Sequence, residues 1–207
     1  MSKMKITDIQ PYKGSILQVD LEDADPLFLH RDIAAEFHLK PGLELPEGAL
    51  EEIRTASQRR RAYERALYLL DVRAYGFAEL FEKLEQNYEE DVCYWVLGRL
   101  VKLGMIDDRR YAASLAEKYV IVKHYGLYRA KQEMRRKGLD DELIDDALAA
   151  YAEETDAQLA ALLERKYAAD LADPSDQKRI NRVKAALVRR GYGYDAIRSA
   201  LEDYYAE

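Results

Sequence analysis

Hydrophobic residues along this chain follow two different periods, one for the first fifty residues and another for the rest. In the first part, short runs rich in β-branched residues at 5–9 and 15–21 predict two strands, joined by a turn at Pro11–Gly14. Residues 26–30 fit a third strand, and a short helix is expected over 32–38. These elements should form a small β-rich module, which is too small to be stable alone and should pack on the helical part of the chain.

From about residue 47 onward, apolar residues recur at the spacing of helices, and glycines interrupt them. One predicted helix begins after Asp107, which suits the N-cap position, and its apolar face holds Tyr111, Leu115, Tyr119 and Val122. Gly138 stands where a glycine that ends a helix is expected. Farther on, Asp173–Pro174 predicts an N-cap followed by proline at the first helical position.

Two segments of the helical part repeat each other without a gap. Arg135–Gly138 matches Val188–Gly191 at an offset of 53 (191 − 138). The same offset aligns five further pairs: Ala130 with Val183, Met134 with Leu187, Ile144 with Ile197, Leu148 with Leu201, and Tyr151 with Tyr204. The segment around 77–101 fits this template more loosely, so the chain carries three copies of one unit.

The repeats predict a mainly α fold in which three tandem three-helix units follow the β-rich module. We place the module at residues 1–50 and the repeats at 51–106, 107–154 and 155–207. A unit of about 50 residues cannot bury enough apolar surface alone, so neighbouring units must stack. Stacking in a row would give an elongated array, which suits a protein that lies along a large, repetitive partner.

Composition and charge narrow the possible classes of function. The 207 residues include 32 basic and 39 acidic side chains, and the formal net charge is −7. That sign disfavours a general nucleic-acid coat but allows a local basic patch. No apolar run approaches the roughly 20 residues that span a bilayer, and the N-terminus lacks the apolar core of a signal peptide. With a single cysteine and hence no internal disulfide, we expect a cytoplasmic protein without a membrane partner.

The sequence carries no constellation typical of an enzyme. The three histidines, His30, His38 and His124, are too scattered to form a metal pair on one helix face. Cys93 lies on the apolar face of its predicted helix, which favours a core residue over a nucleophile. Gly191 lacks the following lysine and the preceding strand of a phosphate-binding loop. We therefore expect no catalytic residue, no metal ion and no cofactor.

The strongest local feature is a separation of charge in the second repeat. Six basic residues within 15 positions, which we call the basic strip, accompany only one acidic residue, Glu133: Lys123, Arg129, Lys131, Arg135, Arg136 and Lys137. Acidic residues follow at once, from Asp140 to Asp146. This order fits simple complementarity to the helix dipole, but it also fits a contact surface for a charged partner. Arg109 and Arg110, at the start of the preceding helix, are further contact candidates.

Two other features leave alternatives open. The cluster Arg59–Arg61 suits a solvated helix or, alternatively, contact with phosphate or an acidic partner. Of the 16 tyrosines, those at repeat positions such as Tyr111 and Tyr119 favour packing roles. Four others lie near predicted helix ends, within reach of a partner: Tyr125, Tyr128, Tyr192 and Tyr194.

Taken in order, several of these residues resemble a known family. Gly104–Ala112 is similar to the signature that joins the first and second repeats of RecX regulatory proteins. The run from Gly126 through Arg129 to Lys137–Gly138 resembles that family's second repeat, and the pattern covers roughly residues 55–205. Asn87 departs from it, because glycine is usual at that point of the first repeat.

The resemblance implies a regulator that binds the filament of the RecA recombinase on single-stranded DNA. Such a protein would lie along the filament groove and restrain ATP hydrolysis, strand exchange and filament growth. We expect a monomer, and weak DNA contact of its own is compatible with this role. This role belongs to homologous recombination, DNA repair and the SOS response. From the residues alone, a direct DNA-binding protein is an alternative, because three-helix units resemble helix-turn-helix folds. A helical scaffold for an unrelated partner is another.

Overall fold

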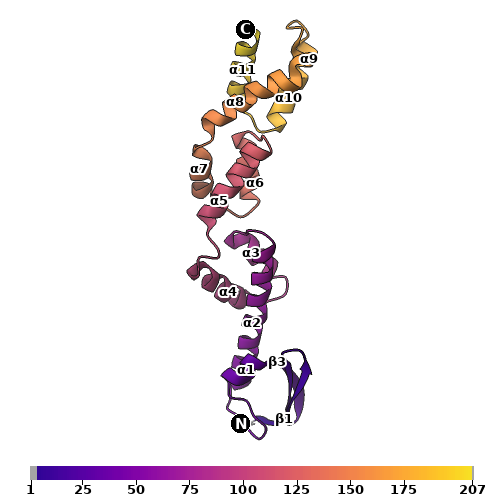
Figure 1. Ribbon diagram of the computed structural model, residues 1–207, viewed down its shortest axis with the longest axis vertical. Coiled ribbons are helices and arrows are strands. Elements are labelled where there is room, and N and C mark those ends of the chain that lie inside the picture. Colours follow the sequence, from indigo (N-terminus) through magenta and orange to yellow (C-terminus); the bar gives the residue numbers. More distant parts are fainter. Residues whose placement is uncertain (1–3, 207) are drawn as a thin grey trace. The chain divides into compact units, whose positions relative to one another are not determined.

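The computed structural model describes residues 4–206 and contains two compact units (Figure 1). The first unit runs to Arg73 and includes Phe81–Leu103; the second consists of Ala74–Leu80 and the residues from Gly104 onward. The fold is mainly α, with three three-helix repeats after a small antiparallel sheet, as the sequence predicts. Within residues 4–206, no helix combines the length and the apolar character needed to cross a membrane.

A four-stranded antiparallel sheet forms most of the N-terminal module, in the order β3-β2-β1-β4. Its elements are β1 (Met4–Lys13), β2 (Ile16–Leu21), β3 (Ala24–His30), helix α1 (Arg31–Glu36) and β4 (Glu44–Leu45). One face of the sheet buries Ile6, Val19 and Leu29 against Ile33 of α1 and Ile53 of the long helix α2 (Ala49–Val72). The module therefore completes its core with the first turns of α2, which confirms that it packs on the helical part of the chain.

The predicted turn at Pro11–Gly14 is wrong by three residues. β1 continues through Pro11, which lies opposite Leu17 of β2, and the turn consists of Gly14 and Ser15. Proline has no N–H to give to a neighbouring strand, so it is tolerated only where no partner needs one. That condition holds here because β4 pairs only with Met4 and Lys5, which leaves this part of β1 at the edge of the sheet.

The first helical repeat consists of α2, α3 (Phe77–Leu84) and α4 (Glu90–Lys102). Within the first unit, α2 packs on α4 and buries Ala62 and Ala66 completely, together with Leu97 and Leu100. The small alanines on α2 let the two helices approach closely.

The second repeat is built from α5 (Asp108–Glu117), a π-helical turn η1 (Lys118–Val122), α6 (Leu127–Arg135) and α7 (Asp141–Ala149). Asp107 caps α5 as predicted, since its Oδ1 accepts a 3.0 Å hydrogen bond from the N–H of Arg110. The predicted apolar face is wrong at Val122, which is 71% exposed, whereas Val120 is buried. A π-helical turn has more residues per turn than an α-helix, so it shifts the buried face away from the 3.6-residue spacing.

The third repeat follows the same plan, including the π-helical turn. Its elements are α8 (Ala152–Leu162), η2 (Leu163–Tyr167), α9 (Ala168–Leu171), α10 (Gln177–Arg189) and α11 (Tyr194–Ala206). The offset of 53 is confirmed by burial, because Met134 and Leu187 are fully buried and Leu148 and Leu201 are both 5% exposed.

The N-cap predicted at Asp173 is wrong, because α10 begins three residues later. Asp176 is the cap, and its Oδ1 accepts a 3.0 Å hydrogen bond from the N–H of Arg179. Asp173 instead accepts hydrogen bonds from both the N–H and the hydroxyl of Ser175, which closes a turn before the helix.

Gly138 follows α6 and Gly191 follows α10, the second of the three helices in their repeats. Within the second unit, both glycines also lie at contacts between successive repeats. Gly138 has φ +77°, and a Cβ there would lie 2.4 Å from the Cβ of Ala78 at the start of α3. Gly191 has φ +89°, and a Cβ there would lie 2.4 Å from the backbone of Arg129 at the start of α6. In the first repeat the corresponding loop holds Asn87, and this repeat follows the N-terminal module instead of another repeat.

Candidate functional site

The basic strip lies on and around α6 in the second unit, and carboxylates pair with most of its cations. Lys131 Nζ is 2.5 Å from Asp145 Oδ1, on α7. Arg135 donates two hydrogen bonds of 2.7 Å to the two carboxylate oxygens of Asp141, at the start of the same helix. The acidic run that follows the strip in sequence thus folds back onto it and compensates its charge.

The Arg135–Asp141 pair has the parallel two-bond geometry that makes guanidinium–carboxylate contacts strong. These hydrogen bonds hold the pKa of Asp141 below its usual value and raise the pKa of Arg135. Both side chains are well exposed, at 41% and 57%, so solvent screens the pair. The pair orders this part of the surface more than it stabilises the fold.

Lys137 has a different environment, in which a buried carboxylate joins two repeats. Its Nζ lies 2.6 Å from Oε1 of Glu79, a residue of α3 that is only 8% exposed. The hydroxyl of Tyr111 on α5 donates a 2.8 Å hydrogen bond to the other carboxylate oxygen. Because Glu79 is buried, both contacts are needed to compensate its charge. Lys137 therefore has a structural role at the junction.

Lys123 and Arg129 meet at an aromatic ring at the other end of the strip. The Nζ of Lys123 lies 5.7 Å from the ring centre of Tyr125, and Cζ of Arg129 lies 4.1 Å from it. Arg129 also donates a 3.0 Å hydrogen bond to the carbonyl of Arg189 in α10. This contact connects the strip on α6 to the third repeat.

The remaining contact candidates of the second repeat are more exposed. Arg136, with 73% of its side chain exposed, makes a 3.3 Å contact with Glu133 on its own helix. Arg109 on α5 is 3.8 Å from Asp146, and Arg110 donates a 3.2 Å hydrogen bond to the carbonyl of Gly104. These arginines are held by single contacts, so a partner can reach them.

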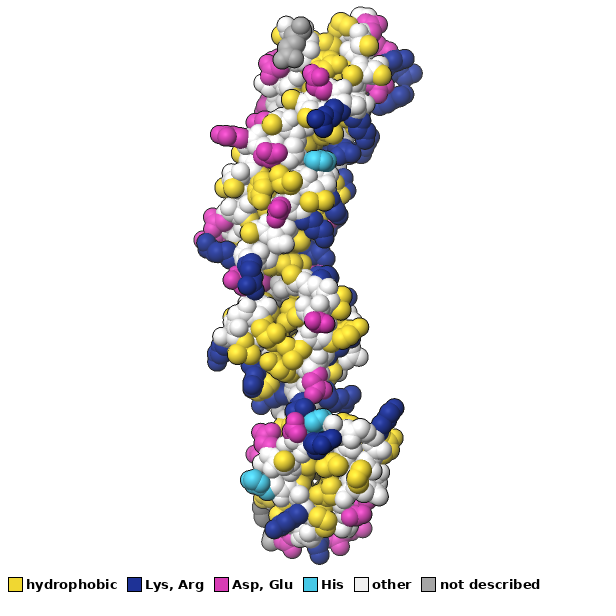
Figure 2. Space-filling model, in the orientation of Figure 1, with side chains coloured by type: hydrophobic (Ala, Val, Ile, Leu, Met, Phe, Trp, Pro, Cys, Tyr) yellow, Lys and Arg dark blue, Asp and Glu magenta, His cyan; other side chains and the backbone are white. Residues whose placement is uncertain are grey.

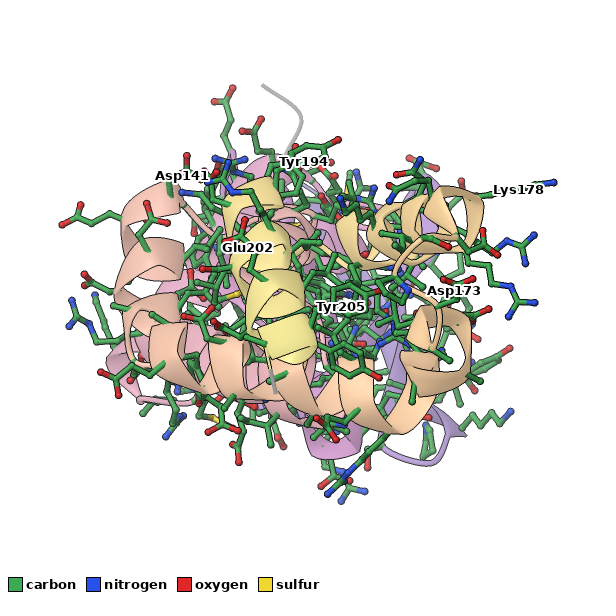
Figure 3. The ribbon with its side chains drawn as sticks, turned by 90° about the horizontal axis from the view of Figure 1, so that it is seen from above. Asp141, Asp173, Lys178, Tyr194, Glu202 and Tyr205 are labelled. Atoms are coloured by element: carbon green, nitrogen blue, oxygen red, sulfur yellow. The ribbon has the colours of Figure 1, made fainter. Side chains whose placement is uncertain are left out.

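Helix α10 carries a second basic surface, which was not predicted from the sequence. Between residues 177 and 193 there are six basic residues and no acidic one: Lys178, Arg179, Arg182, Lys184, Arg189 and Arg190. Among the described residues, Arg179 is the only one of the six in an ion pair, with Asp176. Figure 3 shows Lys178 pointing away from the ribbon into solvent. The same count of basic and acidic residues that identified the basic strip in the second repeat would have identified this surface in the third.

The repeat alignment explains why most cations of α10 form no ion pair among the described residues. At the offset of 53, the three carboxylates of repeat two that pair with the strip are replaced: Glu133 by Ala186, Asp141 by Tyr194 and Asp145 by Arg198. Within residues 4–206, the same fold thus presents a basic face that is mostly paired with carboxylates in repeat two and mostly unpaired in repeat three. In Figure 2 the Lys and Arg side chains of the second unit gather along the edge that carries α6 and α10, which we call the basic edge.

The cysteine and a histidine that were considered as catalytic or metal-binding residues contribute to the fold instead. Cys93 is fully buried in α4, and burial raises the pKa of its thiol, with nearby carboxylates adding to the effect. The ring Nδ1 of His30 accepts a 3.2 Å hydrogen bond from the N–H of Asp32 at the start of α1. In the part of the chain that the structure describes, no group of three or more metal-ligating side chains is placed to hold an ion.

The four tyrosines near helix ends are not equally accessible. Tyr128 and Tyr194 are 68% and 78% exposed, as expected for residues within reach of a partner. Tyr192 is only 4% exposed, and its hydroxyl donates a 3.4 Å hydrogen bond to the carbonyl of His124. The expectation of access is therefore wrong for Tyr192, because its ring fills the junction between repeats two and three.

Comparison with protein families gives matches to three consecutive domains. Residues 62–100 match the first three-helix domain of RecX, residues 107–148 the second and residues 153–201 the third. A curated regulatory protein RecX from Trichlorobacter lovleyi is 36% identical over 143 residues, which are 68% of this chain and 93% of that protein. The one from Streptococcus sanguinis is 28% identical over 201 residues, covering 96% of this chain and 76% of that protein.

Solved structures agree with the sequence relatives. A crystal structure of a regulatory protein RecX superposes with a TM-score of 0.73 at 25% identity and covers 97% of this chain and 99% of that one. A RecX structure from Lactobacillus salivarius gives a TM-score of 0.67 at 25% identity and covers 73% of this chain. The superposition that covers 97% of this chain includes the N-terminal module, so the similarity extends to the sheet as well as to the helical repeats.

Proposed function

This chain belongs to the RecX family of regulatory proteins, and on that premise we propose that it binds the RecA filament on single-stranded DNA and inhibits it. The observation that carries the proposal is the match to three RecX domains in their family order. We propose that the protein lies along the filament groove and restrains ATP hydrolysis, strand exchange and filament growth. It acts by binding, as a cytoplasmic monomer, and performs no reaction itself.

We assign the contact surface to the basic edge formed by α6 and α10. A filament on DNA is a polyanion, and exposed guanidinium groups are suited to phosphates and carboxylates alike. Among the described residues, only Arg179 of these cations is in an ion pair, with Asp176, so the other five cations of α10 are available to a partner without breaking an ion pair. We also propose that the repeats meet at residues 106 and 154. With these boundaries, each of the last two repeats contains one basic helix, α6 or α10.

The test of this function is strand exchange by the cognate RecA in the presence of the protein. We expect inhibition at amounts below one protein per RecA monomer, because a protein bound in the groove spans several subunits. A lack of any effect at equal amounts would contradict the proposal.

Charge reversal separates the two halves of the basic edge. Arg182→Glu with Lys184→Glu should weaken filament binding strongly, because neither side chain forms an ion pair with another described residue. Lys131→Glu with Arg135→Glu should also weaken binding, but it replaces side chains already paired with Asp145 and Asp141. Both double variants should leave the thermal melting temperature nearly unchanged, since all four side chains lie at the surface. Undiminished binding in both variants would show that the basic edge is not the contact surface.

Direct DNA binding is the second candidate, and the uncompensated charge of α10 favours it. It predicts that the protein shifts DNA without RecA, with an affinity that falls steeply as salt rises. A flat salt response would remove this candidate and leave the filament as the target.

A further inference from the structure

A second type of surface lies in the first unit, where α2 and α4 pack together. Four side chains alternate there between cation and aromatic ring: Arg59 and Tyr63 on α2, Trp95 and Arg99 on α4. Cζ of Arg59 lies 5.1 Å from the ring centre of Trp95, and Cζ of Arg99 lies 5.8 Å from the same ring. Arg99 also lies 5.4 Å from the ring of Tyr63. Each helix contributes one ring and one guanidinium, spaced four residues apart on one face.

Carboxylates of the described residues do not compensate the charge of this surface. In the part of the chain that the structure describes, neither Arg59 nor Arg99 forms an ion pair. Arg60, the next residue on α2, differs because it contacts Asp32 at 3.0 Å and Glu64 at 3.1 Å. The two unpaired guanidinium groups are thus held by rings, while the paired one faces carboxylates.

The indole ring of Trp95 is also exposed to solvent. Trp95 is 40% exposed, which is unusual for a residue that normally fills a core. An indole beside two guanidinium groups offers a flat apolar face and positive charge at the same place. Unstacked bases bind to such rings and to guanidinium planes, while the phosphates between them need cations. An acidic protein segment would use the arginines but not the flat ring faces.

We propose that Arg59, Tyr63, Trp95 and Arg99 form a contact site for single-stranded nucleic acid, with bases against the rings and phosphates on the arginines. This site is separate from the basic edge of the second unit, and it would bind free single strands whether or not the protein acts on RecA. Duplex DNA should bind it less tightly, because its bases are already stacked and paired.

The experiment uses the full chain and its own fluorescence, because Trp95 is the single tryptophan. Titration with a short oligothymidylate at low salt should quench the tryptophan emission to saturation, whereas the matching duplex and polyglutamate should quench it less. Absence of quenching by the single strand would overturn the proposal. Equal quenching by the duplex, or stronger quenching by polyglutamate, would overturn it too, the latter in favour of an acidic protein partner.

Two double variants test whether Arg59 and Arg99 are the cations that contact the phosphates. Arg59→Gln with Arg99→Gln should reduce the slope of log affinity against log salt by about 1.4, since each phosphate contact on a single strand contributes about 0.7. The matched control is Arg61→Gln with Arg65→Gln, which removes the same charge from the other flank of α2, where Arg65 lies 5.3 Å from the ring of Tyr68. It should retain the wild-type slope. An equal loss in the control, or no loss in the first variant, would overturn the proposal whatever the outcome of the strand-exchange test.

Discussion

At the scale of single residues, glycines and one buried carboxylate hold successive repeats together. Gly138 and Gly191 have a left-handed backbone and lie in close contact with the preceding repeat. A side chain is therefore disfavoured both by the backbone conformation and by the lack of space. Glu79 adds a buried charge that Tyr111 and Lys137 compensate from two other elements. These contacts give the second unit a defined arrangement of its repeats.

The glycine contact predicts a difference between two otherwise similar substitutions. Gly104→Ala introduces a side chain at φ +67° but meets nothing within 4 Å, so it should cost about 1–2 kcal/mol for the backbone conformation alone. Gly138→Ala adds a clash with Ala78 and should cost clearly more. Urea unfolding of both variants measures the difference, and equal losses would mean that the Gly138 junction is not tightly packed.

The buried carboxylate predicts a similar contrast. Glu79→Ala should lower the free energy of unfolding by about 2–3 kcal/mol, because it leaves the Tyr111 hydroxyl and the Lys137 ammonium without this acceptor. Glu133→Ala removes a more exposed carboxylate and should cost below about 1 kcal/mol. Denaturant unfolding of the two variants is the check, and a cost for Glu79→Ala as small as that for Glu133→Ala would count against its structural role.

Local signals in the sequence identify such residues only in part. Gly138 could be predicted as a helix end because a glycine followed an amphipathic run, but its contact with Ala78 joins residues 60 positions apart (138 − 78). Asp173 and Asp176 both suit an N-cap, and the choice between them depends on the turn that Ser175 closes. Local preference therefore finds the candidate residues, and tertiary contact decides among them.

At the scale of elements, one helical plan is used with two different surface charges. Repeats two and three share the π-helical turn, the buried positions and the helix-ending glycine. In repeat two, α7 places Asp141 and Asp145 against the cations of α6, whereas the equivalent residues of repeat three are Tyr194 and Arg198. The basic strip could be predicted from the sequence but its pairing could not, because Asp141 and Asp145 meet it only after α7 folds back. The charge of α10 was not predicted, although a count of basic and acidic residues between 177 and 193 shows it.

Equivalent core positions should contribute equally to stability. Leu148→Ala and Leu201→Ala each remove a side chain that is 5% exposed, and each should cost about 2–5 kcal/mol. Denaturant unfolding of each variant tests this. A loss below about 1 kcal/mol at either site would contradict the assignment of that leucine to the core.

The Arg135–Asp141 pair predicts a shifted titration. The folded-state pKa of Asp141 is lowered, so its contribution is present above the unfolded-state pKa and is lost as pH falls through the folded-state pKa. In Arg135→Ala the carboxyl should titrate at a higher pH than in the wild type. Carboxyl chemical shifts followed by NMR from neutral to acid pH measure both midpoints, and identical midpoints would contradict the pair.

At the scale of the whole molecule, the repeats predict an elongated outline. A compact globule of 207 residues would have a radius of gyration of about 17 Å. If the repeats stack in a row, small-angle scattering should give a value well above that, because a repeat in such an array touches only its neighbours. A value close to that of the globule would contradict the prediction that the protein lies along a filament.

The function itself is a property of the whole molecule, and the DNA-dependent ATPase of the cognate RecA tests it most directly. Wild-type protein, added at a small fraction of the RecA concentration to filaments on single-stranded DNA, should lower the steady-state rate of ATP hydrolysis. The variant Arg182→Glu with Lys184→Glu should need a higher concentration for the same effect. An unchanged rate with wild-type protein, even at one molecule per RecA monomer, would contradict the account.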